Sequence, residues 1–180
     1  GCNSPGLSPL AVLVGPPGAG KSSVAEILAA RTGTTARDTD QDIVRLTGRS
    51  IGQIFAEQGE PGFRCLEHEV VSAAVREHSG VLALGGGAVV HPGTREVLRG
   101  LPVVFLDTGL SDAEQRLRGN DSRPLLREDF SRRWLTLMAE RRPLYLSVAR
   151  VVVSTQGRTP QQVASAVHSE LIGTAVGATS

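Results

Sequence analysis

Residues 15–22 read GPPGAGKS and follow an apolar run at residues 10–14. Glycines at this spacing let the backbone turn tightly, so that successive N–H groups point inward at the start of the following helix. This is the pattern of a P-loop, in which the N–H groups hold nucleotide phosphates, the lysine reaches the β and γ phosphates and the serine binds Mg2+. The pattern therefore predicts phosphoryl transfer. The expected nucleotide-binding residues of this loop are Gly18, Ala19, Gly20, Lys21, Ser22 and Ser23.

Two carboxylates, Asp38 and Asp40, stand one residue apart after a weak candidate strand at residues 35–37. If the segment is extended, both side chains point the same way and can face one site beyond the end of a strand. The same pattern also suits an acidic loop that only caps the following helix. Asp107 is a competing candidate, because it ends the apolar run at residues 103–106 and many P-loop proteins carry an aspartate at the end of such a strand.

The elements that must position these residues are visible as five short runs of strand length. They lie at residues 10–14, 35–37, 81–84, 103–106 and 151–153. All but the weak second run are continuously apolar, which is typical of strands buried on both faces of a parallel sheet. Helical patterns lie between them. This alternation predicts an α/β fold, a three-layer open parallel sheet of five strands with helices on both faces, whose ligands bind beyond the carboxyl ends of the strands.

Capping-box pairs predict where three of the helices begin. The pairs are Ser50 with Gln53, Ser111 with Glu114, and Thr159 with Gln162. Pro160 then falls in a first turn, where proline is tolerated. Trp134, Met138 and Tyr145 recur at helical spacing, which predicts that they pack in the core.

Length and composition narrow the class of protein. A chain of 180 residues with a net charge of +1 should form one domain, and no global charge recruits nucleic acid or a membrane surface. We expect that domain at residues 10–172, between a disordered or non-native tail at 1–9 and a flexible tail at 173–180. Cys2 and Cys65 are far apart, the four histidines lack metal spacing, and no apolar run is long enough for a membrane span. We therefore expect a cytoplasmic protein.

Several further motifs follow the P-loop in a defined order. They are Asp-Thr-Asp at 38–40, Phe-Arg at 63–64 within 59–67, LGGGAV at 84–89, RPLL at 123–126 and RRPLY at 141–145. Over residues 10–171 this set resembles the shikimate kinase family. The resemblance implies a P-loop fold of the nucleoside monophosphate kinase type and a monomer. It also implies a mobile lid, which we place at residues 118–129 because that segment is charged and poor in apolar residues. The implied reaction is ATP-dependent phosphorylation of the 3-hydroxyl of shikimate, on the route to chorismate and the aromatic amino acids.

Shikimate carries one carboxylate and three hydroxyls, so its site needs cationic forks and hydrogen-bonding groups. Arg64 and Arg141 can each bind a carboxylate through two parallel bonds, and the backbone of residues 85–87 allows close approach by a polar ring. Glu67 falls on the helical face of Arg64 and can orient it. Taken alone, arginines are mostly solvated surface charges and a glycine run is often an ordinary turn. A shikimate-binding region is expected at about 38–67, and the full set of expected substrate residues is Asp40, Arg64, Glu67, Gly85, Gly86, Gly87 and Arg141.

The resemblance also implies catalytic roles. By position in the family motif, Asp40 holds the reacting hydroxyl and accepts its proton, while Asp38 helps to position Mg2+ through water beside Ser22. In the lid, Arg123 reaches the transferring phosphates when the lid closes. Together with Lys21, the residues Asp40 and Arg123 are thus the expected catalytic set.

The remaining nucleotide contacts also come from the resemblance. Arg116 and Pro160 match positions that sandwich adenine, and Arg158 matches a further nucleotide contact. Arg123 completes this part of the expected ATP site.

The chain departs from the family pattern at three places. Arg37 replaces the apolar residue that usually precedes the Asp-Thr-Asp motif, which weakens the second strand. Pro61 and Gly62 stand in a segment that is usually helix-forming, where Pro61 can begin a helix in its first turn. Arg142 directly follows Arg141, and we choose Arg141 as the pocket residue by its offset from the next proline.

Two other functions remain open from the sequence. A gluconate or nucleoside monophosphate kinase would share the P-loop, but a nucleotide acceptor needs a base-stacking pocket and the chain is only 3% aromatic. A nucleotide-dependent switch would use Asp107 as its metal ligand and would leave Arg64 and Arg141 without a role.

Overall fold

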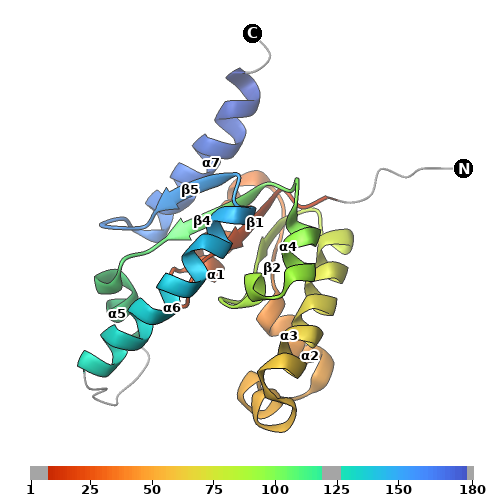
Figure 1. Ribbon diagram of the computed structural model, residues 1–180. Coiled ribbons are helices and arrows are strands. Elements are labelled where there is room, and N and C mark those ends of the chain that lie inside the picture. Colours follow the sequence, from red (N-terminus) through yellow and green to blue (C-terminus); the bar gives the residue numbers. More distant parts are fainter. Residues whose placement is uncertain (1–7, 119–126, 178–180) are drawn as a thin grey trace, which may run out of the picture.

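The computed structural model describes residues 8–118 and 127–177 (Figure 1). Its strands are β1 (Ala11–Val14), β2 (Ala36–Asp38), β3 (Val81–Ala83), β4 (Val103–Asp107) and β5 (Val151–Ser154). They form one parallel sheet in the order β2-β3-β1-β4-β5. The expected five-stranded parallel sheet is confirmed, with strand boundaries within one or two residues of the apolar runs.

Helices cover both faces of this sheet. The helical elements are α1 (Lys21–Thr32), α2 (Thr39–Thr47), α3 (Ile51–Glu77), η1 (Ala88–Val90), α4 (Pro92–Leu98), α5 (Leu110–Arg118), α6 (Arg127–Val148) and α7 (Pro160–Gly177). Side chains of α1 and α7 share one core with Leu13 and Val104, whereas α3, α4 and α6 share the other with Val12 and Phe105. Alternate residues of each central strand thus enter opposite cores. The described helices include none that is long and apolar enough to cross a membrane.

The lobe formed by α2 and the first half of α3 has its own small core, which contains Ile43, Ile54 and Phe63. Within α3 the helix breaks at Gly59, whose φ of 71° and ψ of 176° are not helical. Pro61 then falls in the first turn of the second segment, as the sequence predicted. This break sets the direction in which the residues after Pro61 leave the lobe.

The strands at the two edges of the sheet explain two differences from expectation. Val152 was expected to be buried on both faces, but its exposed fraction is 46% because β5 is an edge strand. At the other edge, the side chain of Arg37 on β2 pairs with Asp42 at 2.5 Å and with Glu77 at 3.2 Å. Arg37 therefore ties the edge strand to α2 and α3 in place of apolar packing.

Two of the three capping boxes are confirmed. Ser50 and Gln53 exchange reciprocal hydrogen bonds at the start of α3, and Thr159 and Gln162 do so at the start of α7. The prediction for Ser111 is wrong, because α5 already begins at Leu110 and Ser111 lies inside it. The Gly109 carbonyl accepts the first helical bond there, from the N–H of Ala113.

The expected domain limits differ slightly from the ordered elements. Helix α7 continues to Gly177, past the expected end at residue 172, because a single interior glycine costs only about 1 kcal/mol relative to alanine and does not break a helix. At the other end Pro9, assigned to the tail, is buried. Residues 119–126, which form most of the expected lid, lie outside the described residues.

Candidate active site

The P-loop connects the end of β1 to the start of α1. Gly15, Gly18 and Gly20 all have positive φ angles, of 152°, 85° and 81°. A Cβ at Gly15 would lie 2.8 Å from the Leu106 carbonyl oxygen, and one at Gly18 would lie 3.2 Å from the Cα of Ala113. Conformation and space thus both require glycine. The resulting turn presents the N-terminus of α1, which attracts anions.

Lys21 lies at the bottom of this loop. Its ammonium group donates hydrogen bonds to the carbonyl oxygens of Gly15 at 2.8 Å and Pro16 at 3.0 Å. Burial lowers the pKa of Lys21 to about 8, although the charges of Asp40 and Asp38 work in the opposite direction. The nearby charge of Arg141 lowers it further. A phosphate group arriving here would meet a cation that already lies close to two carboxylates.

Asp38 ends β2 and serves two groups at once. One carboxylate oxygen caps α2 by accepting the N–H of Asp40 at 2.8 Å, and the other accepts the hydroxyl of Ser22 at 2.5 Å. Because this cap starts the helix at Thr39, the segment is not extended through Asp40, contrary to the first option considered. Asp38 therefore caps α2, as the second option proposed, and its other oxygen faces Ser22 on α1.

Asp40 lies in the first turn of α2 and lines the same cavity as Lys21. Burial raises the pKa of Asp40, and the charge of Asp38 raises it further, while Lys21 and Arg64 oppose the rise. A Cβ at Gly85 would come within 2.5 Å of the Asp40 carboxylate and 2.9 Å of Glu67. The lack of a side chain at Gly85 thus lets the two carboxylates approach the loop after β3.

Arg64 and Glu67 form a buried pair one helical turn apart on α3. Arg64 donates to Glu67 at 2.7 Å, and their exposed fractions are 9% and 1%. Burial raises the pKa of Glu67, and the bond from Arg64 opposes this. The guanidinium also lies over the rings of Phe63 and Phe55, at 5.2 and 5.8 Å from their centroids. These contacts hold the cationic fork in one orientation.

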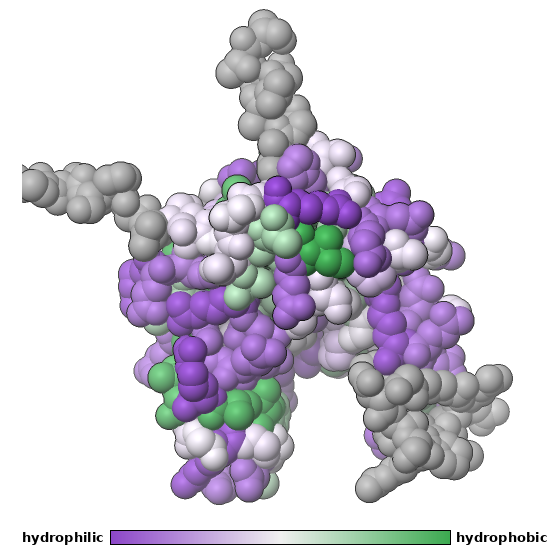
Figure 2. Space-filling model, turned by 180° about the vertical axis from the view of Figure 1, so that it is seen from behind, coloured by the Kyte–Doolittle hydropathy of each residue, from purple (hydrophilic) through white to green (hydrophobic). Residues whose placement is uncertain are grey.

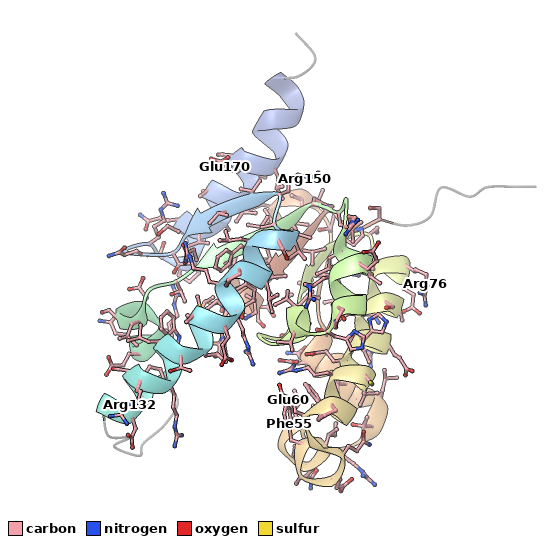
Figure 3. All side chains as sticks on the ribbon, in the orientation of Figure 1. Phe55, Glu60, Arg76, Arg132, Arg150 and Glu170 are labelled. Carbon is pink, nitrogen blue, oxygen red and sulfur yellow. The ribbon has the colours of Figure 1, made fainter. Side chains whose placement is uncertain are left out.

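Figure 3 labels Phe55 and Glu60, which lie together on the α2–α3 lobe. Glu60 lies 3.5 Å from the Arg64 Nε, and Phe55 packs on Phe63 with ring centroids 4.6 Å apart. Gly87 approaches Arg64 from the other side, since a Cβ there would overlap the guanidinium. Arg64 is thus enclosed by the lobe and by the glycine loop.

The neighbouring residues Arg141 and Arg142 on α6 have different partners. Arg141 is near enough for its charge to affect the pKa values of Lys21, Glu67 and Tyr145. Arg142 instead donates to Asp107 at 2.7 Å, at the end of β4. Asp107 is therefore paired with a cation and does not line the cavity of Ser22 and Lys21.

A cavity of about 440 Å³ joins the P-loop to the two aspartates. It is lined by Gly18, Gly20, Lys21, Ser22, Ser23, Asp38, Asp40, Leu84, Arg116 and Pro160. Arg116 on α5 donates to the Gly18 carbonyl at 3.1 Å. Arg158 does not line this cavity and bonds to the Ser154 carbonyl at 3.2 Å. Ala19 is fully buried beneath the loop, and Arg123 lies outside the described residues.

Sequence reasoning missed one polar contact of the site. Tyr145 was expected as core, and together with Trp134 and Met138 it is indeed buried. However, its hydroxyl also donates to the carbonyl oxygen of Gly86. The only sequence signal was its place at the end of the RRPLY motif. Leu84, which lines the cavity, was not among the expected site residues, although it ends an apolar run and begins the LGGGAV motif.

Comparisons with known proteins agree with this geometry. The family model for shikimate kinase matches residues 17–172. A shikimate kinase from Streptomyces coelicolor is 51% identical over 159 residues, covering 88% of this chain and 93% of that protein. One from Streptomyces avermitilis is 50% identical over 163 residues, covering 91% and 95%.

A solved structure gives the same result in three dimensions. The shikimate kinase from Acinetobacter baumannii, in complex with shikimate, superposes with a TM-score of 0.84 at 35% identity, covering 93% of this chain and 94% of that chain. Sequence and structure thus agree over most of the length of both proteins. The chain belongs to the shikimate kinase family.

Proposed function

We propose that the protein transfers the γ-phosphoryl group of ATP to the 3-hydroxyl of shikimate, giving shikimate 3-phosphate and ADP. The carrying observation is the position of Asp40, which lines one cavity with Lys21 of the P-loop and lies near enough to Arg64 for that charge to affect its pKa. A carboxylate close to both a phosphate-binding cation and a carboxylate-binding cation suits an acceptor that is both an acid and an alcohol.

In the proposed reaction, Asp40 holds the acceptor hydroxyl and takes its proton. A bond forms between the hydroxyl oxygen and the γ-phosphorus, and the bond from that phosphorus to the β-γ bridging oxygen breaks. The raised pKa of Asp40 makes its carboxylate a better proton acceptor than an ordinary aspartate. Lys21 neutralises charge on the transferring group. Positioning and charge neutralisation thus account for most of the catalysis.

The residues around Ser22 fit a magnesium ion. The Ser22 hydroxyl and the Asp38 carboxylate lie 2.5 Å apart, and hard oxygen ligands of this kind are those that Mg2+ prefers. We propose that Ser22 binds the ion directly and Asp38 through water. An ion held by these residues would supply positive charge that neutralises the phosphate oxygens of ATP.

For the acid substrate, we propose that Arg64 and Arg141 bind the carboxylate and that Glu67 keeps Arg64 in place. The loop of residues 85–87 comes close to both Asp40 and Arg64, because a Cβ on Gly85 or Gly87 would overlap them. A small polar ring could therefore lie against the backbone of this loop.

For the nucleotide, we propose that Arg116 and Pro160 hold the adenine, because both line the P-loop cavity. Arg158 does not line this cavity, but we still propose it as a contact of the nucleotide. Arg123 remains the proposed lid residue that reaches the phosphates. We further propose that the protein acts as a monomer in the cytoplasm.

Isothermal titration with shikimate tests this function against a nucleotide-dependent switch. We expect binding heat with and without ADP, and a loss of that heat in Arg64→Met, because the variant removes the cationic fork. Arg76→Met, on the same helix near its end (Figure 3), is the matched control and should bind normally. A wild-type protein that gives no heat with shikimate in either condition would contradict the proposal.

A further inference from the structure

Tyr145 is the largest fully buried side chain among the described residues, and it carries a hydroxyl. That hydroxyl donates to the carbonyl oxygen of Gly86 at 2.5 Å, 59 residues away in the sequence. The ring is held from behind by Phe105, with centroids 5.0 Å apart. A buried phenol needs a partner, and this one finds it in the glycine loop.

The bond to Gly86 also fixes the neighbouring N–H group. The carbonyl of Gly86 and the N–H of Gly87 belong to one planar trans peptide, so they point in opposite directions. Holding the carbonyl toward Tyr145 therefore directs the Gly87 N–H away from it. The N–H groups of Ala88 and Val90 donate hydrogen bonds to the carbonyl oxygens of Gly85 and Gly87. In contrast, no described residue accepts a hydrogen bond from the N–H of Gly87.

Gly87 itself lies against the cation that the proposed function assigns to the acid substrate. A Cβ at Gly87 would overlap the guanidinium of Arg64, so the loop backbone and this cation are in direct contact. Arg141 is four residues before Tyr145 on α6 and therefore shares its helical face. A backbone N–H close to guanidinium groups is an arrangement that suits a carboxylate.

We propose that Tyr145 is a positioning residue for the substrate carboxylate. Its hydroxyl holds the Gly86–Gly87 peptide so that the Gly87 N–H joins Arg64 in binding the acid. Two adjacent glycines leave this peptide free to rotate, because neither has a Cβ to restrict it. The inference rests on the proposed function and adds to it a residue that does not itself touch the substrate.

The variant Tyr145→Phe tests this role, because it removes the hydroxyl and keeps the ring. We expect the KM for shikimate to rise by about three- to tenfold, the usual effect of losing one hydrogen bond. The KM for ATP should stay unchanged, and kcat should change by less than about twofold, because the lost interaction is equal in ground and transition states. Ser147→Ala removes an exposed hydroxyl from the same helix and should match the wild type.

Shikimate methyl ester separates positioning of the carboxylate from general packing. Without the charge, the difference in KM between the wild type and Tyr145→Phe should shrink. An unchanged KM for shikimate, an equal rise with the ester, or a parallel rise of both KM values with a lower melting temperature would overturn the inference. The proposed function fails separately, if the wild type itself does not phosphorylate shikimate.

Discussion

Lys21 and Asp40 carry opposite charges in one cavity, and burial disfavours the charged form of both. Burial lowers the pKa of the amine to about 8 and raises the pKa of the carboxyl. Each group stabilises the charge of the other, yet neither compensates fully for the loss of water. The free protein therefore holds two groups whose protonation should respond when a polyanion or an acceptor alcohol binds.

Binding of ADP at pH 8.5 should be coupled to proton uptake by Lys21. In the free protein the amine is largely neutral above pH 8 because its pKa is lowered. The phosphates restore its charge, so their binding raises the pKa and a proton is taken up. Titration calorimetry in buffers of different ionisation enthalpy measures this uptake. It should fall at pH 7, where the amine is already protonated, and an enthalpy independent of buffer at pH 8.5 would contradict the account.

Asp40→Asn should abolish turnover and spare the nucleotide. We expect kcat to fall by at least about a hundredfold, the lower range for loss of a general base, while the Kd for ADP stays within about threefold. A coupled ADP-release assay and calorimetry measure the two quantities. Glu77→Gln makes the same chemical change on an exposed side chain and should leave kcat intact. Near-normal turnover in Asp40→Asn would refute the role assigned to Asp40.

At the scale of elements, the break in α3 positions the acid-binding pair. Gly59 ends the first segment, and Arg64 and Glu67 lie in the second, which packs beside the glycine loop after β3. A straight helix would carry these side chains elsewhere on the lobe. The backbone angles at Gly59 belong to a region that is essentially restricted to glycine.

Gly59→Ala should therefore destabilise the protein by about 1–3 kcal/mol. Its effect on the position of Arg64 should also raise the KM for shikimate more than the KM for ATP. Urea unfolding and steady-state kinetics measure these effects. In contrast, Gly52→Ala changes a helical glycine in the same element and should not lower the stability. Equal unfolding midpoints for Gly59→Ala and the wild type would argue against a strained break.

Local sequence patterns predicted the helices and strands well, but they could not predict side-chain hydrogen bonds between residues far apart in the sequence. The P-loop, the five strands and two capping boxes depend on residues close together in the sequence, so the local sequence is sufficient to predict them. Arg142 bonds to Asp107 across 35 residues, and Tyr145 bonds to Gly86 across 59. Such contacts depend on how α6 packs against β4 and the glycine loop, which no local pattern contains. The capping prediction for Ser111 failed because the carbonyl of Gly109, two residues earlier, already accepts the first helical bond.

At the scale of the whole molecule, the large exposed apolar side chains of the described residues occur in two separate places. Val44 and Leu46 lie on α2, in the lobe where Figure 2 shows a hydrophobic area, and their exposed fractions are 43% and 67%. Leu135, Leu146 and Val152 lie on α6 and β5, on the other side of the molecule in Figure 1. Neither set resembles the large continuous apolar interface of an obligate dimer.

We therefore expect a monomer of 18.9 kDa in solution. Size-exclusion chromatography with light scattering measures the mass directly, and the value should not change with protein concentration. A mass twice as large at micromolar concentration would contradict this prediction. In that case Leu135→Lys and Leu46→Lys would show which of the two surfaces forms the contact.

The central claim is that the cavity beside the P-loop serves a transfer from ATP to shikimate. The most direct test is an assay of ADP release with shikimate, gluconate and nucleoside monophosphates as alternative acceptors. The account predicts that only shikimate accelerates ATP consumption, and that phosphorus NMR detects a new phosphate ester on its 3-hydroxyl. No acceleration by shikimate, or faster turnover with gluconate or a nucleotide, would contradict it.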